Sequence, residues 1–217
     1  MARPKVALIS RRKVLETALA IIDQDGLEGL TIRRLADALG VNGASLYHHF
    51  EHKDEILIGA AEFALADVRT PEGSDADWRN WLPENARKLR AALLEHPALM
   101  PLIVSKRSLG MGAHMLDTSA ERLVQEGVPS AAVMPLLDAL ELFAIGSVLH
   151  ETQGYSPEKK HDLETEKYPA LAKAMAERGL SSEEIFDLVT ASILDAVDAA
   201  VKERQARWFP AVEAVGR

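Results

Sequence analysis

The stretch Leu30–Lys53, LTIRRLADALGVNGASLYHHFEHK, has the pattern of two short helices joined by a tight turn. Its apolar residues recur at spacings of three and four, which predicts a first helix over 31–38 with Thr31 as its cap. These apolar residues are Ile32, Leu35, Ala36 and Leu39. Gly40 can adopt a positive φ without steric cost, so it can end this helix and turn the chain. Asn42 is the predicted N-cap of a second short helix, which completes a helix-turn-helix.

The second helix presents small and polar residues on its outer surface once Leu46 points inward. Small residues let a helix enter the major groove of DNA closely, and hydroxyl, amide or imidazole groups can contact bases or phosphates. The predicted DNA-binding residues are Arg33, Asn42, Gly43, Ala44, Ser45, Tyr47, His48 and Lys53. An ordinary helical hairpin in an all-α protein would have the same spacing, so the pattern alone leaves both interpretations open.

The charge is divided unevenly along the chain. The net charge is −8, but residues 1–60 contain eight Lys+Arg and eight Asp+Glu and are therefore neutral. Residues 1–15 contain five basic side chains and no acidic one, which favours phosphate contacts, although a solvated basic tail is the alternative. The absence of cysteine excludes disulfides and thiolate metal sites. We find no signal-peptide pattern and expect no membrane span, so the predicted location is cytoplasmic.

Three parts of an all-α chain are predicted: a helix-turn-helix domain over 1–52, a connecting helix within 53–69 and a ligand-binding and dimerisation domain over 70–217. The first part gains a third helix from Ser10 to about residue 25, with Gly26 as its stop. The connecting helix is expected over 53–68, and the composition of 70–77 is that of a loop. Pro83 should kink the helix that follows or delay its start.

Two long amphipathic segments, 130–151 and 182–206, are rich in small residues that allow helices to approach closely. They predict a helix-pair homodimer interface, a four-helix arrangement across a two-fold axis. Packing within one chain would explain the same periodicity.

The run GLEGLTIRRLADALGVNGASLYHHFEHKDEIL closely resembles the helix-turn-helix of the TetR family of bacterial transcriptional repressors. The matching letters are Leu46-Tyr47-His48-His49-Phe50 and Lys53-Asp54-Glu55-Ile56-Leu57. The segments 78–97 and 139–153 also look like the C-terminal domain of the tetracycline repressors within that family. The resemblance implies a homodimer that binds double-stranded operator DNA and is released by a small-molecule effector.

In the tetracycline repressors, an Asn that corresponds to Asn85 hydrogen-bonds the drug, and a His and a Glu help to coordinate its magnesium. The alignment gives Ile103 at that His and His150 at that Glu. Because Mg²⁺ requires oxygen ligands, we expect a more apolar effector than a magnesium–tetracycline chelate, and no cofactor or metal. The predicted ligand-binding residues are Arg69, Trp81, Asn85, Leu89, Ile103, Met111, His114, Met115, Phe143, Ser147 and His150.

Each of these residues has a plainer interpretation. Apolar residues at helical spacing usually form core, and single histidines are usually satisfied structurally. A second cluster, His48, His49 and His52, superficially suggests a metal site, but turn packing and DNA contact explain it better. No phosphate loop, nucleophile elbow or Cys–His pair predicts an enzyme. The alternative functions are an α-helical small-molecule-binding protein or enzyme without specific DNA binding, and a DNA-bound protein without an effector.

Overall fold

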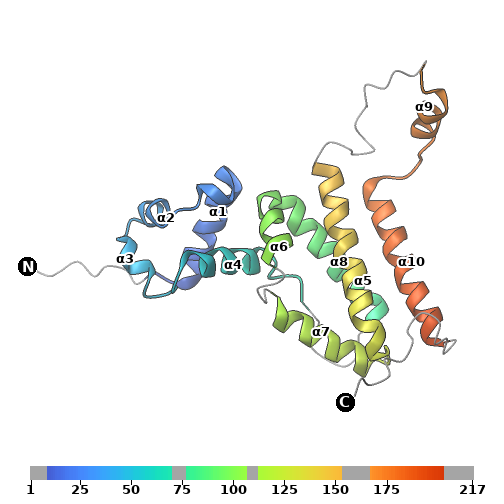
Figure 1. The fold of residues 1–217 in the computed structure, drawn as a ribbon, viewed down its shortest axis with the longest axis horizontal. Helices are drawn as coiled ribbons and strands as arrows, with labels where there is room; N and C mark the ends of the chain where they lie inside the picture. Colours follow the sequence, from blue (N-terminus) through green and yellow to red (C-terminus); the bar gives the residue numbers. More distant parts are fainter. Residues whose placement is uncertain (1–8, 70–76, 107–111, 153–166, 203–217) are drawn as a thin grey trace, which may run out of the picture. The chain divides into compact units, whose positions relative to one another are not determined.

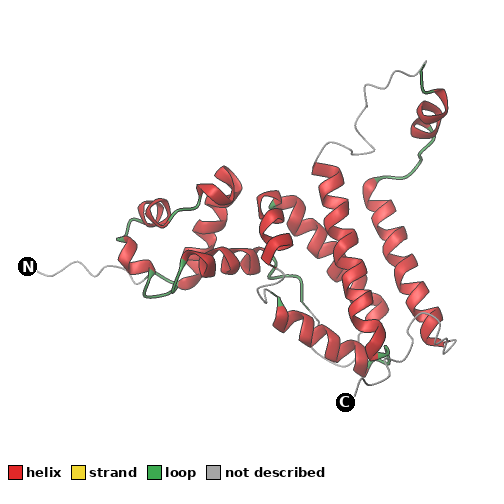
Figure 2. Cartoon of the chain, viewed as in Figure 1, coloured by secondary structure: helices red, strands yellow, loops and turns green. Residues whose placement is uncertain are grey.

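The computed structural model describes residues 9–69, 77–106, 112–152 and 167–202. Within these ranges every regular element is a helix, which confirms the all-α prediction (Figure 2). The chain divides into two compact units: Met1–Asp67 with Glu95–Ala113, and Val68–Leu94 with His114–Arg217. One break in this division falls between Asp67 and Val68, and the grouping of 95–113 with the N-terminal unit was not predicted.

Helix α1, Arg11–Gly29, opens the first unit. The Ser10 side chain accepts a hydrogen bond from the backbone N–H of Lys13 (3.2 Å), so Ser10 is the predicted cap. The backbone is non-helical at Gly26, where φ is 73°, and a final turn continues to Gly29. The predicted stop is therefore correct in position, although the chain turns into a further helical piece there.

Helices α2 (Ile32–Leu39) and α3 (Gly43–Leu46) form the helix-turn-helix (Figure 1). Thr31 caps α2 by accepting from the backbone N–H of Arg34 (3.1 Å), and Gly40 ends it in the left-handed conformation with φ 67°. The Asn42 side chain accepts from the backbone N–H of Ala44 (3.1 Å) and so caps α3. All three predicted end signals are confirmed.

Helix α4 covers Lys53–Ala64 and is shorter than the predicted 53–68. Leu65 has φ −93° and ψ 12°, outside the α-helical region, and the N–H of Ala66 bonds back to the carbonyl of Phe63. Val68 is nevertheless buried, so the turn satisfies the apolar spacing that suggested a longer helix. The short helices η1 (Pro97–Leu99) and α6 (Met100–Lys106) also belong to this unit, where η1 packs on α1 and α6 packs on α4.

The second unit contains α5 (Trp78–Glu95), α7 (Ala113–Gln125), α8 (Ser130–Thr152), α9 (Pro169–Ala176) and α10 (Ser182–Lys202). The helix α5 begins at Trp78 with Pro83 inside it, so the delayed start that we considered is wrong. Asp77 caps α5, because its side chain accepts from the backbone N–H of Arg79 (3.0 Å). The helices α8 and α10 run side by side (Figure 1), and the predicted part of the second beyond residue 202 lies outside the described residues.

The main core of the second unit gathers around Trp78, Trp81 and the inner face of α8. A smaller cluster joins Ala86, Ala144 and Phe186, with Leu89 and Phe143 packed against it. By length and composition alone, α8 is long and apolar enough to cross a membrane. Core helices of soluble proteins pass the same test, and seven residues of α8 are buried in this unit.

Candidate DNA-binding surface and effector domain

The predicted DNA-binding residues of α3 and the turn after it lie together on the surface of the first unit. Leu46 and Phe50 are buried and anchor this segment to the core. Tyr47 exposes 55% of its area although it is a large aromatic residue, and His48 beside it is exposed too. A rigid scaffold therefore presents polar groups outward, as contact with a DNA groove requires.

The other predicted DNA-binding residues surround this surface. Asn42 and Ala44 are exposed, whereas Gly43, Ser45 and Lys53 are partly buried. Arg33 on α2 is almost fully exposed and lies 3.9 Å from the carboxylate of Asp37, a weak surface ion pair. The Arg33 guanidinium thus remains accessible to a phosphate.

The basic residues at the start of α1 do not behave alike. Arg12 pairs with Glu16 on the same helix (2.8 Å) and holds the pKa of that carboxyl below its usual value. Lys13 approaches the same carboxylate at 3.6 Å. Arg11 instead reaches across the unit to His49 and Glu55, which are 38 and 44 residues away in the sequence, a pairing that no local sequence pattern indicates.

The three histidines near the recognition segment have separate environments. His48 is exposed, His49 is partly buried, and His52 caps α4 by accepting from the backbone N–H of Glu55 at Nδ1 (3.3 Å). Among the residues that the structure describes, no three His, Cys, Asp or Glu side chains are grouped as metal ligands would be. The histidine cluster therefore has a structural role at His52 and a surface role at His48.

Several predicted ligand-binding residues meet where α5, α8 and α10 pack. Phe143 stacks on Phe186 with ring centroids 5.2 Å apart, and Leu89 packs against the same cluster. The Ser147 hydroxyl accepts a hydrogen bond from Nε of Arg90 (3.0 Å). Asn85 is partly buried on α5.

Sequence reasoning missed the charged pair at this place. The Arg90 side chain is 13% exposed, bonds to Glu151 at 2.5 Å and lies 5.4 Å from the centre of the Phe186 ring. A signal was available, because Ser147 and Glu151 are four residues apart on α8 and therefore face the same neighbour. A largely buried guanidinium with one carboxylate partner is chemically suited to an anionic or aromatic group.

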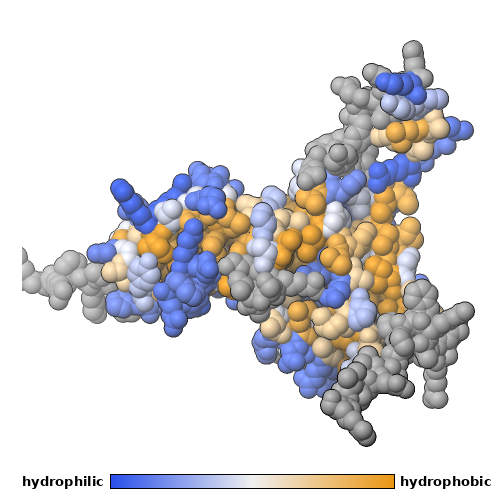
Figure 3. Space-filling model, in the orientation of Figure 1, coloured by the Kyte–Doolittle hydropathy of each residue, from blue (hydrophilic) through white to orange (hydrophobic). Residues whose placement is uncertain are grey.

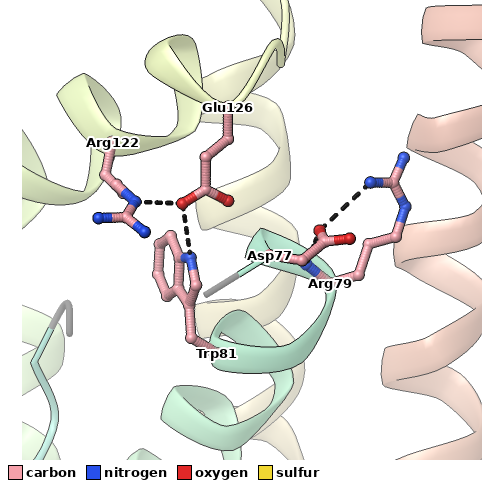
Figure 4. A network of polar contacts seen from close by, with 5 residues as sticks. All are labelled: Asp77, Arg79, Trp81, Arg122 and Glu126. Carbon is pink, nitrogen blue, oxygen red and sulfur yellow. Dashed lines mark hydrogen bonds and ion pairs between the residues drawn. The ribbon is translucent and has the colours of Figure 1, made fainter. Parts of the chain in front are cut away.

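Trp81 lies in a different part of the second unit. Its indole Nε1 donates to the carboxylate of Glu126 at the end of α7 (3.4 Å), and Arg122 pairs with the same carboxylate oxygen (Figure 4). The second oxygen of Glu126 is buried and has no hydrogen-bond partner among the residues that the structure describes. In this structure Trp81 therefore ties α5 to α7 and does not lie with Phe143 and Ser147.

The remaining predicted ligand-binding residues are dispersed. Arg69, His114 and His150 are exposed, and Met115 is partly buried on α7. Ile103 is buried on α6 in the first unit, and Met111 lies outside the described residues. Neither Ile103 nor the exposed His150 offers the oxygen ligands that magnesium prefers.

An open groove of about 350 Å³ runs between α5 and α10, away from all of these residues. Its walls include Arg79, Arg87 and Asp187, and the Arg87–Asp187 ion pair spans it at 2.7 Å. This pairing raises the pKa of Arg87 further above its usual value. The groove is shallow and already bridged, so it resembles a helix–helix seam more than an effector pocket.

Comparison with known proteins supports the assignment of both parts. Residues 14–60 match the family described as "Bacterial regulatory proteins, tetR family", and residues 70–201 match "Tetracyclin repressor-like, C-terminal domain". The chain is 33% identical to the tetracycline repressor protein class A from transposon 1721 of Escherichia coli, over 66% of this chain and 67% of that protein.

Solved structures agree over nearly the whole chain. Apo ActR from Streptomyces coelicolor superposes with a TM-score of 0.71 and 26% identity, covering 92% of this chain and 99% of that one. The complex of ActR with actinorhodin gives a TM-score of 0.67 and 25% identity, covering 89% and 98%. With the helix-turn-helix geometry above, these matches establish that the chain belongs to the tetR family of bacterial regulatory proteins and is a DNA-binding repressor with the C-terminal domain of a ligand-responsive regulator.

Proposed function

We propose that the chain is a cytoplasmic homodimer that occupies a palindromic operator through two helix-turn-helix domains and leaves it when a small-molecule effector binds. The observation that supports this most strongly is the anchored α3, capped by Asn42, with Tyr47 and His48 exposed beside it. The proposed DNA contacts are the eight residues predicted from sequence. The proposed division is 1–52 for DNA, 53–69 for the connection and 70–217 for effector and partner.

The outer face of α8 supports the homodimer. Leu142 and Leu149 remain 62% and 46% exposed, although the opposite face of the helix is buried in the core. On α10, Leu188 remains 57% exposed, and Figure 3 shows apolar residues along α10 on the face in view. Exposed leucines on two long neighbouring helices are a feature of protein–protein interfaces.

Gly146 lies on the same outer face of α8 and gives a second reason. A glycine inside a helix costs about 1 kcal/mol relative to alanine. Among the described residues, an added Cβ at Gly146 would meet no atom within 4 Å beyond its own helical turn, so the packing that the structure describes does not require the glycine. Close approach of a helix from a second copy would require it.

The effector is proposed to be an apolar or aromatic molecule and not a magnesium chelate. The stacked Phe143 and Phe186, with Arg90 beside them, favour a flat ligand with an acceptor or anionic group. ActR, which was solved in complex with actinorhodin, supports a small-molecule effector in general. The other proposed contacts are the ligand-binding residues predicted from sequence.

Release from DNA requires that the effector bind more tightly to a conformation in which the two DNA-binding domains are wrongly spaced. The chain leads from the DNA-binding domain to the effector domain through α4, so α4 is the proposed transmitter. The alternative is an α-helical enzyme or carrier without specific DNA binding. This alternative gives no role to the exposed Tyr47 and the surface around it, so we disfavour it and propose no catalytic role.

The test of DNA recognition is a mobility-shift titration with the operator obtained by selection from genomic DNA. Tyr47→Ala should weaken operator binding at least tenfold, because losing recognition of one base pair costs about 1–3 kcal/mol and each protomer of the proposed homodimer would lose one. Tyr168→Ala is the matched control, since Tyr168 is 49% exposed and precedes α9. Equal affinities of the two variants would contradict the assignment of Tyr47, and failure of the wild type to select any sequence would contradict the function.

Asn85→Ala tests the effector site separately. We expect the variant to bind the operator normally and to require a changed effector concentration for release. The measurement is release from the operator across a panel of aromatic metabolites. Release identical to that of the wild type would remove Asn85 from the site.

A further inference from the structure

Arg11, the first residue of α1, makes three contacts with the segment that follows the recognition helix. Its Nη1 donates to the backbone carbonyl of His49 (2.8 Å), and its Nη2 donates to the carboxylate of Glu55 (2.8 Å). Its guanidinium carbon lies 4.4 Å from the centre of the Phe50 ring. One planar side chain thus combines a carbonyl, a carboxylate and an aromatic face, a combination that suits Arg and not Lys.

Glu55 extends this arrangement to the next residue. Its second carboxylate oxygen accepts from the backbone N–H of Glu51 (2.8 Å). That hydrogen bond is the main reason that the pKa of Glu55 lies below its usual value, and Arg11 is the next reason. Two side chains therefore hold the segment 49–51. Arg11 of α1 contacts the carbonyl of His49 and the ring of Phe50, and Glu55 of α4 accepts from the N–H of Glu51.

This segment fixes where the recognition surface ends. The N–H groups of His49 and Phe50 bond to the carbonyl of Leu46, the last residue of α3. Because α3 has only four residues, its orientation depends on the capping at Asn42 and on the anchoring of the turn after Leu46. Among the described residues, Arg11 is the basic side chain of α1 that contacts this turn.

We infer that Arg11 is a positioning residue for operator recognition and not a phosphate contact. The inference rests on the proposed DNA-binding function. Arg12 provides the contrast, because its side chain is 78% exposed and its ion pair lies within α1, whereas the side chain of Arg11 is 51% exposed and bridges to α4. Two of the five guanidinium N–H groups of Arg11 are already used inside the unit, and its charge is paired with Glu55, so a phosphate would compete with an existing ion pair for Arg11.

Positioning and phosphate contact predict different salt dependence. A lost phosphate contact reduces the slope of log affinity against log salt by about 0.9 and weakens binding to every sequence. A misplaced recognition helix weakens binding to the operator selectively and leaves that slope unchanged. The ratio of operator affinity to affinity for a scrambled duplex of equal length therefore distinguishes the two roles.

The experiment compares Arg11→Ala, Arg11→Lys and Glu55→Gln with Arg12→Ala as the control, each titrated on the selected operator and the scrambled duplex at several salt concentrations. We expect Arg11→Ala and Arg11→Lys to lose about tenfold in operator affinity, as for one hydrogen bond between charged groups, with the salt slope unchanged. Glu55→Gln should also lower the affinity ratio, and combining it with Arg11→Ala should add little.

The Lys variant decides the question if the Ala variant unfolds, which circular dichroism of the same samples would reveal. Lysine preserves the charge, so a phosphate contact or a solvated charge would survive in Arg11→Lys. Wild-type affinity in that variant, or an equal loss on both duplexes with a shallower slope, would overturn the inference. Such a result would leave the proposed function intact, whereas absence of operator binding by the wild type would refute the function itself.

Discussion

Leu142→Glu is expected to dissociate the proposed homodimer while leaving the protomer folded. Leu142 lies in the middle of α8 with 62% of its area exposed, so the substitution removes little packing within the chain. A partner helix that covers this face would bury the exposed part. The substitution therefore tests the role of the outer face of α8 without disturbing the inner face that packs in the core.

The magnitude follows from the exposed fraction. Full burial of a leucine contributes about 1.5–3 kcal/mol, so covering the exposed part of Leu142 contributes roughly 1–2 kcal/mol per protomer. Because Leu142 occurs twice in a two-fold interface, the substitution should cost about 2–4 kcal/mol in the free energy of dimerisation, which raises the dimer Kd about 30- to 700-fold. Because Glu also introduces an unpaired charge, these values are lower bounds.

The assay is sedimentation equilibrium over a wide range of protein concentrations, with circular dichroism to check the fold. Val124→Glu is the matched control, because Val124 is an exposed apolar residue on α7, outside the proposed interface. We expect wild type and Val124→Glu to remain dimeric at concentrations where Leu142→Glu is monomeric. Equal dissociation constants for the two variants would refute the use of this face of α8.

Three further predictions test other parts of the molecule. Leu46→Ala should cost about 2–5 kcal/mol in the free energy of unfolding measured with urea, because Leu46 is fully buried beneath the recognition surface. Gly146→Ala should raise the helical stability of the isolated protomer by about 1 kcal/mol yet increase the dimer Kd, and a tighter dimer would contradict close approach at this residue. Ser181→Ala should lower the melting temperature near neutral pH, because Ser181 and Glu184 form a reciprocal cap on α10. The pKa of Glu184 lies below its ordinary value of 4.5 because the Ser181 N–H and hydroxyl donate to it, so this part of the stabilisation is present above that value and disappears as pH falls through the folded pKa. The bond from the Glu184 N–H to the Ser181 hydroxyl does not titrate, so the difference between wild type and variant should shrink in acid without vanishing, and a difference that stays the same in acid would contradict the reasoning.

The ends of the helices were the most predictable part of the fold. Thr31, Gly40 and Asn42 act through backbone groups two or three residues away, so a local pattern contains the whole interaction. The end of α4 was predicted less well, because Val68 is buried by a turn and not by a continued helix. Apolar spacing reports burial, and both arrangements satisfy it.

The two candidate sites also differ in how far apart their residues lie in the sequence. Six of the eight predicted DNA-binding residues lie between Asn42 and His48, so identifying α3 also brings these six together. The effector residues come from separate helices, and the structure groups Leu89, Phe143 and Ser147 while it directs Trp81 to Glu126. Contacts such as Arg11–Glu55 and Arg90–Glu151 join positions 44 and 61 residues apart. The spacing of Ser147 and Glu151 places both on one face of α8, but it does not identify Arg90 as their partner.

The two faces of α8 give a physical reason to expect coupling between effector and partner. Ser147, which accepts from Arg90, is next to Gly146 in the sequence, and Phe143 is next to Leu142, so adjacent residues serve the inner and the outer surface. A continuous helix transmits a shift of one face to the other, since its backbone hydrogen bonds resist deformation. If an effector displaced Glu151 from Arg90, the dimer contact would respond. By reciprocity, a substitution such as Leu142→Glu that weakens the dimer should then also change the affinity for effector, even though Leu142 lies on the face of α8 opposite the core.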